Sequence, residues 1–366
     1  MAKFIKRLII CMLVIILFIS SAIFVINLPK FARVKRAFNV FAQDGHFFKN
    51  ASAFGYKKGE FMIQRRNERD NINKGANARE YLNIKTYDLS NQPVHPDVVY
   101  IANGFQGYKY WMAYTPYPFS NALLENPCIV ASNDGVNWDM PYGGNNPIVP
   151  PPDDVNEGGH YSDTDMMFIN GKLRVYYVYN KQGALSLGKI YMSESSDGIK
   201  WSSPELVYQT KKSIEIYSPA IIYKDNLYRM WCFAGENRFF YTTSHDGKTW
   251  DDIKKINIVI DGWRTWHLDV SETDLGYEAL ICSRKEGTNT RALFYASSSN
   301  GVDWNVNKAP VIYPTIVSWD SGGIYRSTFS KQNGKYKVWY SAYDQSNKWH
   351  IGYAEGENIG RLKGMK

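Results

Sequence analysis

The sequence is poor in cysteine. It has four, Cys11, Cys128, Cys232 and Cys282, and none is part of a C-x-x-C pair or a His/Cys cluster. A disulfide framework and a structural zinc site are therefore not indicated. Cys11 lies inside an apolar amino-terminal run, and the other three occur in the strand-like stretches NPCIV, RMWCF and ALICS. We expect these three to be buried free thiols.

Motifs for nucleic-acid binding are also lacking, although the formal net charge is +8. Much of the excess positive charge flanks the apolar amino-terminal run, where contact with lipid headgroups explains it. We therefore expect a membrane contact and no nucleic-acid partner. No loop with the oxygen ligands of a calcium site can be recognised, and the sequence predicts no metal site and no cofactor.

Charged residues are absent from residues 8–28, which read LIICMLVIILFISSAIFVINL. This run is long enough to cross a hydrocarbon core of about 30 Å. Small residues at Ser20-Ser21-Ala22 leave a cleaved signal peptide as the alternative. The apolar run continues through Ile26, which favours an uncleaved anchor. The rest of the chain is globular in composition, with 44% hydrophobic and 15% aromatic residues overall.

A repeated turn motif is what the chain does have. Four copies begin at Ser132, Ser196, Ser244 and Ser299 and read SNDGVNW, SDGIKW, SHDGKTW and SNGVDW. Their spacing of roughly 50 to 60 residues is typical of propellers and other arrays. Asp-Gly or Asn-Gly makes a hairpin turn, and the Trp is expected to pack between blades.

A second repeated unit is a polar-headed strand that leads through a turn into an aromatic strand. The first strands read HPDVVY from His95, DTDMMF from Asp163, SPAIIY from Ser218, HLDVSE from His267 and RSTFSK from Arg326. The aromatic strands read YKYWMAY, LRVYYVY, LYRMWCF, YEALICS and YKVWYSAY. Five units predict an all-β, five-bladed β-propeller, preceded by one N-terminal transmembrane helix. We expect an anchor at residues 1–30, a stalk and entry segment at 31–83, and the propeller at 84–366.

The innermost strands of a propeller line its central channel, so the starts of these five strands should meet around the axis. Alignment puts Asp97, Asp165, Ala220, Asp269 and Thr328 in one ring, and His95, Asp163, Ser218, His267 and Arg326 in a ring two residues earlier. In an extended strand Asp163 and Asp165 share a face. Such polar rings could serve catalysis or only bind water, and the sequence leaves open whether an ion occupies the channel.

The ordered succession of these strands and turns resembles the five-bladed propeller glycoside hydrolases, the clan around families 32, 43, 62, 68, 117 and 130. The resemblance runs from about Tyr81 to Gly360. It implies an aspartate base, a second aspartate that orients substrate and tunes pKa, and a glutamate acid. By position, Asp97 matches the base, and Asp165 or Asp163 matches the tuning aspartate.

The acid is where this sequence departs from the family pattern. The family's glutamate precedes a Gly/Ser-Pro pair, and here Tyr217 stands before Ser218-Pro219. The alternatives for the acid are Glu215, Glu125, Asp163 or a tyrosine, and a further alternative is that the site serves binding alone. The residues that we expect to contact substrate are His95, Glu125, Tyr217, Trp266, His267, Asp269 and Arg326. For Arg326 we expect an acidic sugar, or an ion pair with Asp320 or Asp269.

We interpret the chain as a glycan-acting enzyme, a glycoside hydrolase with an inverting carboxylate mechanism on a cell-surface or capsular polysaccharide. The alternative is a non-catalytic glycan-binding propeller in polysaccharide assembly or export, which the absent glutamate favours. A phosphorylase or transferase on the same scaffold is a third interpretation. We therefore expect a single-pass membrane protein whose large domain lies outside the cytoplasm, where envelope glycans are found.

Overall fold

The computed structural model describes residues 75–181, 187–211, 214–235 and 237–365. In this part of the chain the regular structure consists of strands and four short 3-10 helices, at Pro118–Ser120, Ala122–Leu124, Val155–Glu157 and Ile359–Arg361. None of the helices found there is long and apolar enough to span a membrane. The predicted anchor at residues 1–30 lies outside the described residues and stays a prediction.

Five antiparallel sheets form the blades. Blade 1 contains β1 (Pro93–Phe105), β2 (Tyr108–Pro116) and β3 (Cys128–Ser132). Blade 2 contains β4 (Gly159–Ile169), β5 (Lys172–Lys181), β6 (Lys189–Ser195) and β7 (Glu205–Gln209). Blade 3 contains β8 (Tyr217–Lys224), β9 (Leu227–Phe233), β10 (Phe239–Ser244) and β11 (Lys254–Ile256). Blade 4 contains β12 (Trp263–Thr273), β13 (Gly276–Lys285), β14 (Arg291–Ser298) and β15 (Asn305–Val306). Blade 5 contains β16 (Gly323–Gln332), β17 (Lys335–Tyr343), β18 (Trp349–Gly356) and β19 (Lys363–Gly364).

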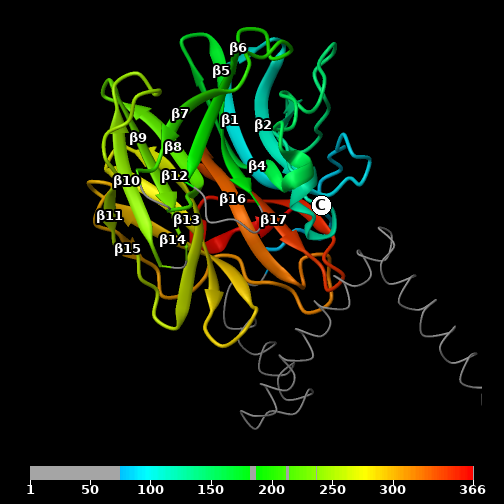
Figure 1. Cartoon of the computed structure of the whole chain (residues 1–366). Helices are drawn as coiled ribbons and strands as arrows, with labels where there is room; N and C mark the ends of the chain where they lie inside the picture. The colour runs from blue at the N-terminus through cyan, green and yellow to red at the C-terminus, as the bar shows by residue number, and fades with distance from the viewer. Residues whose placement is uncertain (1–74, 182–186, 212–213, 236, 366) are drawn as a thin grey trace, which may run out of the picture. The chain divides into compact units, whose positions relative to one another are not determined.

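The innermost strands β1, β4, β8, β12 and β16 contact one another in chain order, and β16 returns to lie beside β1 (Figure 1). The entry segment fastens this closure, because the Leu82 backbone N–H donates to the Ile351 carbonyl of β18 at 2.8 Å. Near the other end, the Gly364 N–H donates to the Gly75 carbonyl at 2.6 Å. The predicted five-bladed, all-β propeller is confirmed.

The repeated turns join the blades together. In the first copy the Asp134 carboxylate accepts the backbone N–H groups of Val136 and Asn137, each at 2.8 Å. This fixes a tight turn whose Gly135 carbonyl accepts the indole N–H of Trp339, a residue of β17 in blade 5, at 2.7 Å. A turn of blade 1 is thereby tied to the aromatic strand of blade 5.

Contacts between a turn glycine and an aromatic side chain recur around the ring. The other turn glycines meet an aromatic side chain of the preceding blade in the pairs Gly198 with Trp111, Gly247 with Tyr176, and Gly301 with Trp231. Blade 5 has no such turn, and the corresponding position of blade 4, in the stretch YEALICS, is Leu280. The prediction that the turn Trp packs between blades is confirmed for Trp138, whose ring meets Trp339 of blade 5, and for Trp304, whose ring meets Trp231 of blade 3.

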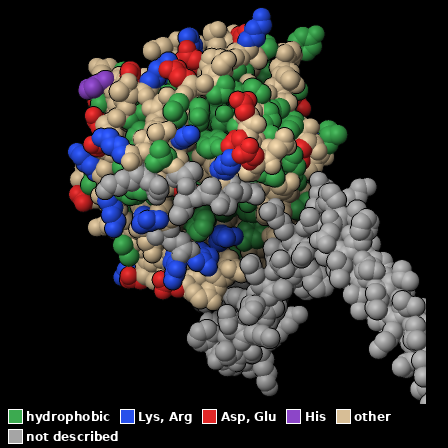
Figure 2. Space-filling model, in the orientation of Figure 1, with side chains coloured by type: hydrophobic (Ala, Val, Ile, Leu, Met, Phe, Trp, Pro, Cys, Tyr) green, Lys and Arg blue, Asp and Glu red, His purple; other side chains and the backbone are tan. Residues whose placement is uncertain are grey.

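Charged side chains of both signs are interspersed on the face that Figure 2 shows, among patches of hydrophobic side chains.

Cys128, Cys232 and Cys282 are buried and free, as the sequence predicts.

Candidate active site

The innermost strands break register near their starts. The pairing of β1 with β2 shifts between Val94 and Asp97, and that of β4 with β5 shifts between Ser162 and Asp165. At these bulges His95 and Asp163 have positive φ, 55° and 51°. A bulge re-aims side chains, so residues two apart no longer need to face one cavity.

Three residues of the earlier ring, His95, Asp163 and His267, line a pocket of about 540 Å³. Its walls are His95, Tyr117, Ala122, Glu125, His160, Ser162, Asp163, Asn180, Lys181, Glu215, Tyr217, Trp266, His267 and Tyr325. The structure thus brings together most of the predicted site residues, namely Asp163, Glu215, His95, Glu125, Tyr217, Trp266 and His267.

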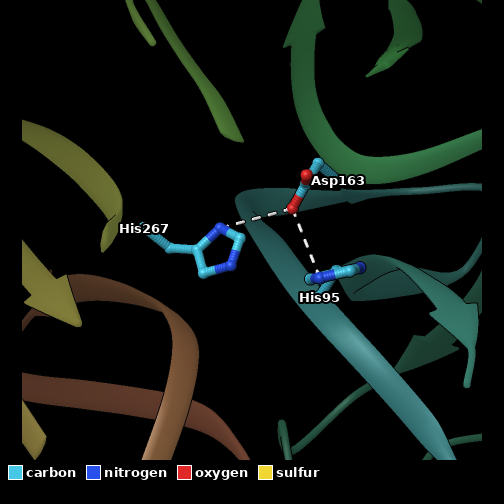
Figure 3. Close-up of side chains that lie close together, drawn as sticks. All are labelled: His95, Asp163 and His267. Atoms are coloured by element: carbon cyan, nitrogen blue, oxygen red, sulfur yellow. Dashed lines mark ion pairs between the residues drawn. The ribbon is translucent and has the colours of Figure 1, made fainter. Parts of the chain in front are cut away.

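Three of these side chains point toward one another from three different blades, as Figure 3 shows for His95, Asp163 and His267. The Oδ1 atom of Asp163 lies 3.3 Å from Nε2 of His95 and 3.4 Å from Nδ1 of His267. One ligand atom from each of the three residues lies within 4.8 Å of the other two, and all three residues are buried. We refer to this group as the His-Asp-His cluster.

The electrostatics of the cluster favour an ionised carboxylate beside neutral imidazole. Burial raises the pKa of Asp163, but the two histidines and Arg326 outweigh it and bring the value to about 2. Burial lowers the pKa of His267 well below its usual range, against the opposing effect of Asp163. An ionised carboxylate and a neutral imidazole are the forms that bind metal ions.

The hydrogen-bond roles of the cluster also fit a metal ion. Nδ1 of His95 lies 3.0 Å from a carboxylate oxygen of Glu125, which can only accept, so Nδ1 carries the proton. In the neutral ring, Nε2 would then turn a lone pair toward Asp163, and among the described residues this atom has no hydrogen-bond partner. Such a lone pair and the carboxylate would repel each other unless a metal ion or a proton lay between them. Two histidines and one carboxylate suit a divalent transition metal with open positions for substrate.

The sequence predicted no metal site, and the structure explains why this set escaped notice. The prediction relied on ligands close in sequence, whereas these three come from β1, β4 and β12. Alignment of the strand starts did place His95, Asp163 and His267 in one ring. That alignment was the only signal that could have revealed the cluster.

Other pocket residues offer proton transfer and sugar contact. The Tyr217 hydroxyl donates to a carboxylate oxygen of Glu215 at 2.7 Å. Trp266 forms part of the wall, and the Arg291 guanidinium stacks at 6.0 Å from the centre of its ring. An aromatic face held in this way is suited to pack against a sugar ring.

The later ring of residues lies elsewhere. Asp97, Asp165 and Asp269 are absent from the pocket walls and line a second cavity of about 540 Å³ with the later residues of the inner strands. This separates Asp163 from Asp165, which the sequence placed on one strand face. The bulge between them is the physical reason.

Each of these three aspartates ties its own blade to the next one. Asp97 accepts the Met166 backbone N–H of blade 2, and Asp165 accepts the Ile221 N–H of blade 3 at 3.2 Å. Asp269 likewise accepts the Phe329 N–H of blade 5 at 3.1 Å. Burial raises the pKa of all three carboxyl groups. Their oxygens lie within 4.8 Å of one another, so this group too could hold a cation.

Arg326 does not line the pocket and is 1% exposed. The sequence suggested Asp320 or Asp269 as its ion-pair partner, but its Nη1 atom lies 3.5 Å from Asp163. Its Nη2 atom donates to the Pro219 carbonyl at 3.0 Å. The structure thus gives Arg326 a place behind Asp163, away from a sugar in the pocket.

Sequence reasoning missed several residues of the pocket. Ser162 directly precedes Asp163 within β4, Asn180 and Lys181 end β5, and none of the three carries a recognisable motif. Thr115, which contacts both His95 and Glu125, lies in the aromatic strand β2 and is fully buried. Only the alternation of inward and outward residues along β2 could have pointed to Thr115.

Comparisons with known proteins bear on both the fold and the pocket. No family model matches this chain. A curated relative, the A type blood N-acetyl-alpha-D-galactosamine deacetylase of Flavonifractor plautii, is 28% identical over 75% of this chain and 46% of its own length. The chain therefore spans about half the length of that relative.

Solved structures share the propeller. An N-acetylgalactosamine deacetylase from F. plautii, in complex with blood group B trisaccharide, has a TM-score of 0.69 at 25% identity and covers 77% of this chain and 95% of that one. A thermostable family-43 glycoside hydrolase has a TM-score of 0.58 at 12% identity, covering 78% and 96%. A structure from the GH130 family has a TM-score of 0.56 at 15% identity, covering 76% and 92%. The chain thus has the five-bladed propeller of the glycoside hydrolase clan, and its relatives are carbohydrate-active enzymes.

Proposed function

We propose that this protein is a metal-dependent deacetylase that removes the acetyl group from an N-acetylated amino sugar of a glycan. The convergence of His95, Asp163 and His267 in one pocket is the observation that carries the proposal. The F. plautii relative supports the substrate class, because it is named for the deacetylation of such a sugar.

The reaction is the hydrolysis of an amide. The oxygen of a water molecule forms a bond to the carbonyl carbon of the acetyl group, and the bond from that carbon to nitrogen breaks. Acetate leaves, and the sugar nitrogen gains a proton. A bound divalent metal would polarise the carbonyl oxygen, which makes the carbonyl carbon more electrophilic, and would lower the pKa of a water molecule.

The chain's own residues divide the remaining work. His95, Asp163 and His267 would hold the ion, and Arg326 supports Asp163 from behind. Glu215 lines the same pocket and is the candidate to carry a proton to the leaving nitrogen. The Trp266 ring offers an apolar wall for the sugar.

An inverting glycoside hydrolase is the second candidate. The carboxylates of Asp163, Glu125 and Glu215 in one pocket favour it, as does the propeller shared with families 43 and 130. Such an enzyme needs a base and a protonated acid about 6.5 to 9.5 Å apart. Asp97, the base that the family resemblance implies, lines the other cavity.

Product analysis separates the two candidates. Full-length protein would be stripped with a chelator, reloaded with Zn²⁺, Mn²⁺ or Co²⁺, and incubated with oligosaccharides that end in N-acetylgalactosamine or N-acetylglucosamine. We expect metal-dependent release of acetate in equal amount to free amine, with no new reducing ends. The Asp163→Asn variant should lose more than about 100-fold in kcat/KM, because removal of residues that only support metal ligands already costs up to that factor.

A matched control is Asp274→Asn, the same chemical change in an exposed turn between β12 and β13, which should retain activity. New reducing ends without acetate would establish the hydrolase instead. Binding of the glycans with neither product would support the non-catalytic propeller.

A further inference from the structure

The two histidines of the His-Asp-His cluster are held in different ways. Nδ1 of His95 lies 3.1 Å from the Thr115 hydroxyl and 3.0 Å from a carboxylate oxygen of Glu125. The Thr115 hydroxyl in turn donates to that same oxygen at 2.9 Å. The three groups form a closed triangle, and each of the three residues is at most 5% exposed.

His267 has no such arrangement at the nitrogen that faces away from Asp163. Among the described residues its Nε2 atom has no hydrogen-bond partner. Its ring instead packs edge-on against Tyr325, with ring centres 4.4 Å apart. On the side of each ring that faces away from Asp163, His95 is therefore held by polar groups, whereas His267 is not.

Local structure fixes Glu125 in its place. It directly follows the 3-10 helix Ala122–Leu124, where its backbone N–H donates to the Ala122 carbonyl at 2.9 Å. The Tyr87 hydroxyl donates to the neighbouring Leu124 carbonyl at 2.8 Å. The carboxylate thus approaches His95 from a loop after β2, on the side opposite Asp163.

We propose that Glu125, with Thr115, is a positioning residue that holds His95 in the tautomer whose Nε2 lone pair faces the metal. This inference rests on the proposed function, because it presumes a metal at the cluster. A carboxylate that accepts the Nδ1 proton fixes the tautomer and ring orientation and increases the donor strength of Nε2. Glu125 therefore acts through His95 and need not touch the glycan.

Metal affinity measured on the full-length protein tests the inference directly. Zn²⁺ would be titrated in competition with a chromophoric chelator, without substrate. Glu125→Gln keeps the size of the side chain but removes the charge, and we expect the Kd for Zn²⁺ to rise by about 10 to 100-fold. Thr115→Val removes only the bridging hydroxyl and should raise the Kd by a smaller factor.

The control is Glu215→Gln, the same substitution at another carboxylate of the pocket, whose hydrogen bond is to Tyr217. Its Kd for Zn²⁺ should stay within about twofold of the wild type, a change well below the loss expected when a ligand's support is removed. The absorption spectrum of the Co²⁺-loaded protein should change in Glu125→Gln and not in Glu215→Gln.

A double variant separates positioning from a purely structural role. In a His95→Ala background, adding Glu125→Gln should leave the Zn²⁺ affinity unchanged, because the histidine through which Glu125 acts is gone. Equal loss of affinity in both backgrounds would overturn the inference, as would unchanged affinity in Glu125→Gln alone. A wild-type protein that binds no Zn²⁺, Mn²⁺ or Co²⁺ would instead refute the proposed metal-dependent function.

Discussion

Asp163 is the residue on which the candidate site converges. Its carboxylate contacts His95, His267 and Arg326, which come from three other blades. Burial alone would favour a neutral carboxyl group, but the positive and polarisable neighbours keep its pKa low. The chain thus places an ionised acceptor at the meeting point of two imidazoles, as a metal site requires.

Gly198 tests how tightly single residues join the blades. A Cβ atom at this position would lie 2.3 Å from the Trp111 ring, whereas a Cβ at Gly171, also at positive φ, would meet nothing within 4 Å. Alanine at either site incurs the left-handed backbone penalty of about 1 to 2 kcal/mol. Gly198→Ala should lose about 1 to 3 kcal/mol more, the usual cost of overpacking. Chemical denaturation of both variants measures the difference, and equal losses would contradict the packing role of Trp111.

Single residues also show how far sequence reasoning reaches. Repeat alignment placed His95, Asp163 and His267 in one ring, and the structure brings them together. The same alignment put Asp97 two residues after His95, and the family resemblance implied that Asp97 is the base, a prediction that stays untested. Its position in the second cavity could not be predicted, because the bulge at His95 leaves no sequence signal beyond the following proline.

The repeated turn is the element that converts sequence repetition into structure. In three copies an aspartate accepts the two backbone N–H groups of the turn, and in the fourth Asn300 does so at 2.9 Å. The side chains of Asn and Asp both carry an oxygen that can accept these two hydrogen bonds. The turn therefore requires an acceptor at this position but no negative charge. This explains why the turn, and with it the fold class, could be recognised from the sequence.

The pH dependence of stability should report the charge in these turns. Partial burial raises the pKa of Asp134, but the N–H groups of Asn137 and Val136 outweigh it and lower the value to about 2. The unfolded value is about 3.9. Because the folded pKa is the lower one, the stabilisation is complete above about pH 4 and is lost as the pH falls toward 2.

Asp134→Asn keeps the acceptor, as Asn300 shows, but removes the titrating group. We expect the variant to fold at neutral pH and to lose less stability than the wild type between about pH 4 and 2. Unfolding midpoints measured across this range provide the test, with Asp274→Asn as the control for a change in net charge. An acid-induced loss as large as that of the wild type would contradict the role of Asp134.

On the scale of the whole molecule, the propeller works by delivering short stretches of distant sequence to one axis. His95, Asp163 and His267 of the earlier ring line the pocket, and Asp97, Asp165 and Asp269 of the later ring link the blades. Repeats predicted the number of blades because each repeat is one sheet. They could not predict which end of the channel each ring faces, because that depends on bulges and on about 3.3 Å of rise per strand residue.

The proposed function depends above all on a metal ion bound between blades 1, 2 and 4. Crystals of the full-length protein grown with Zn²⁺ would be measured by anomalous diffraction on both sides of the zinc absorption edge. We expect one strong peak about 2.0 to 2.2 Å from Nε2 of His95, a carboxylate oxygen of Asp163 and Nδ1 of His267. No peak at this position, or a peak only among Asp97, Asp165 and Asp269, would contradict this expectation.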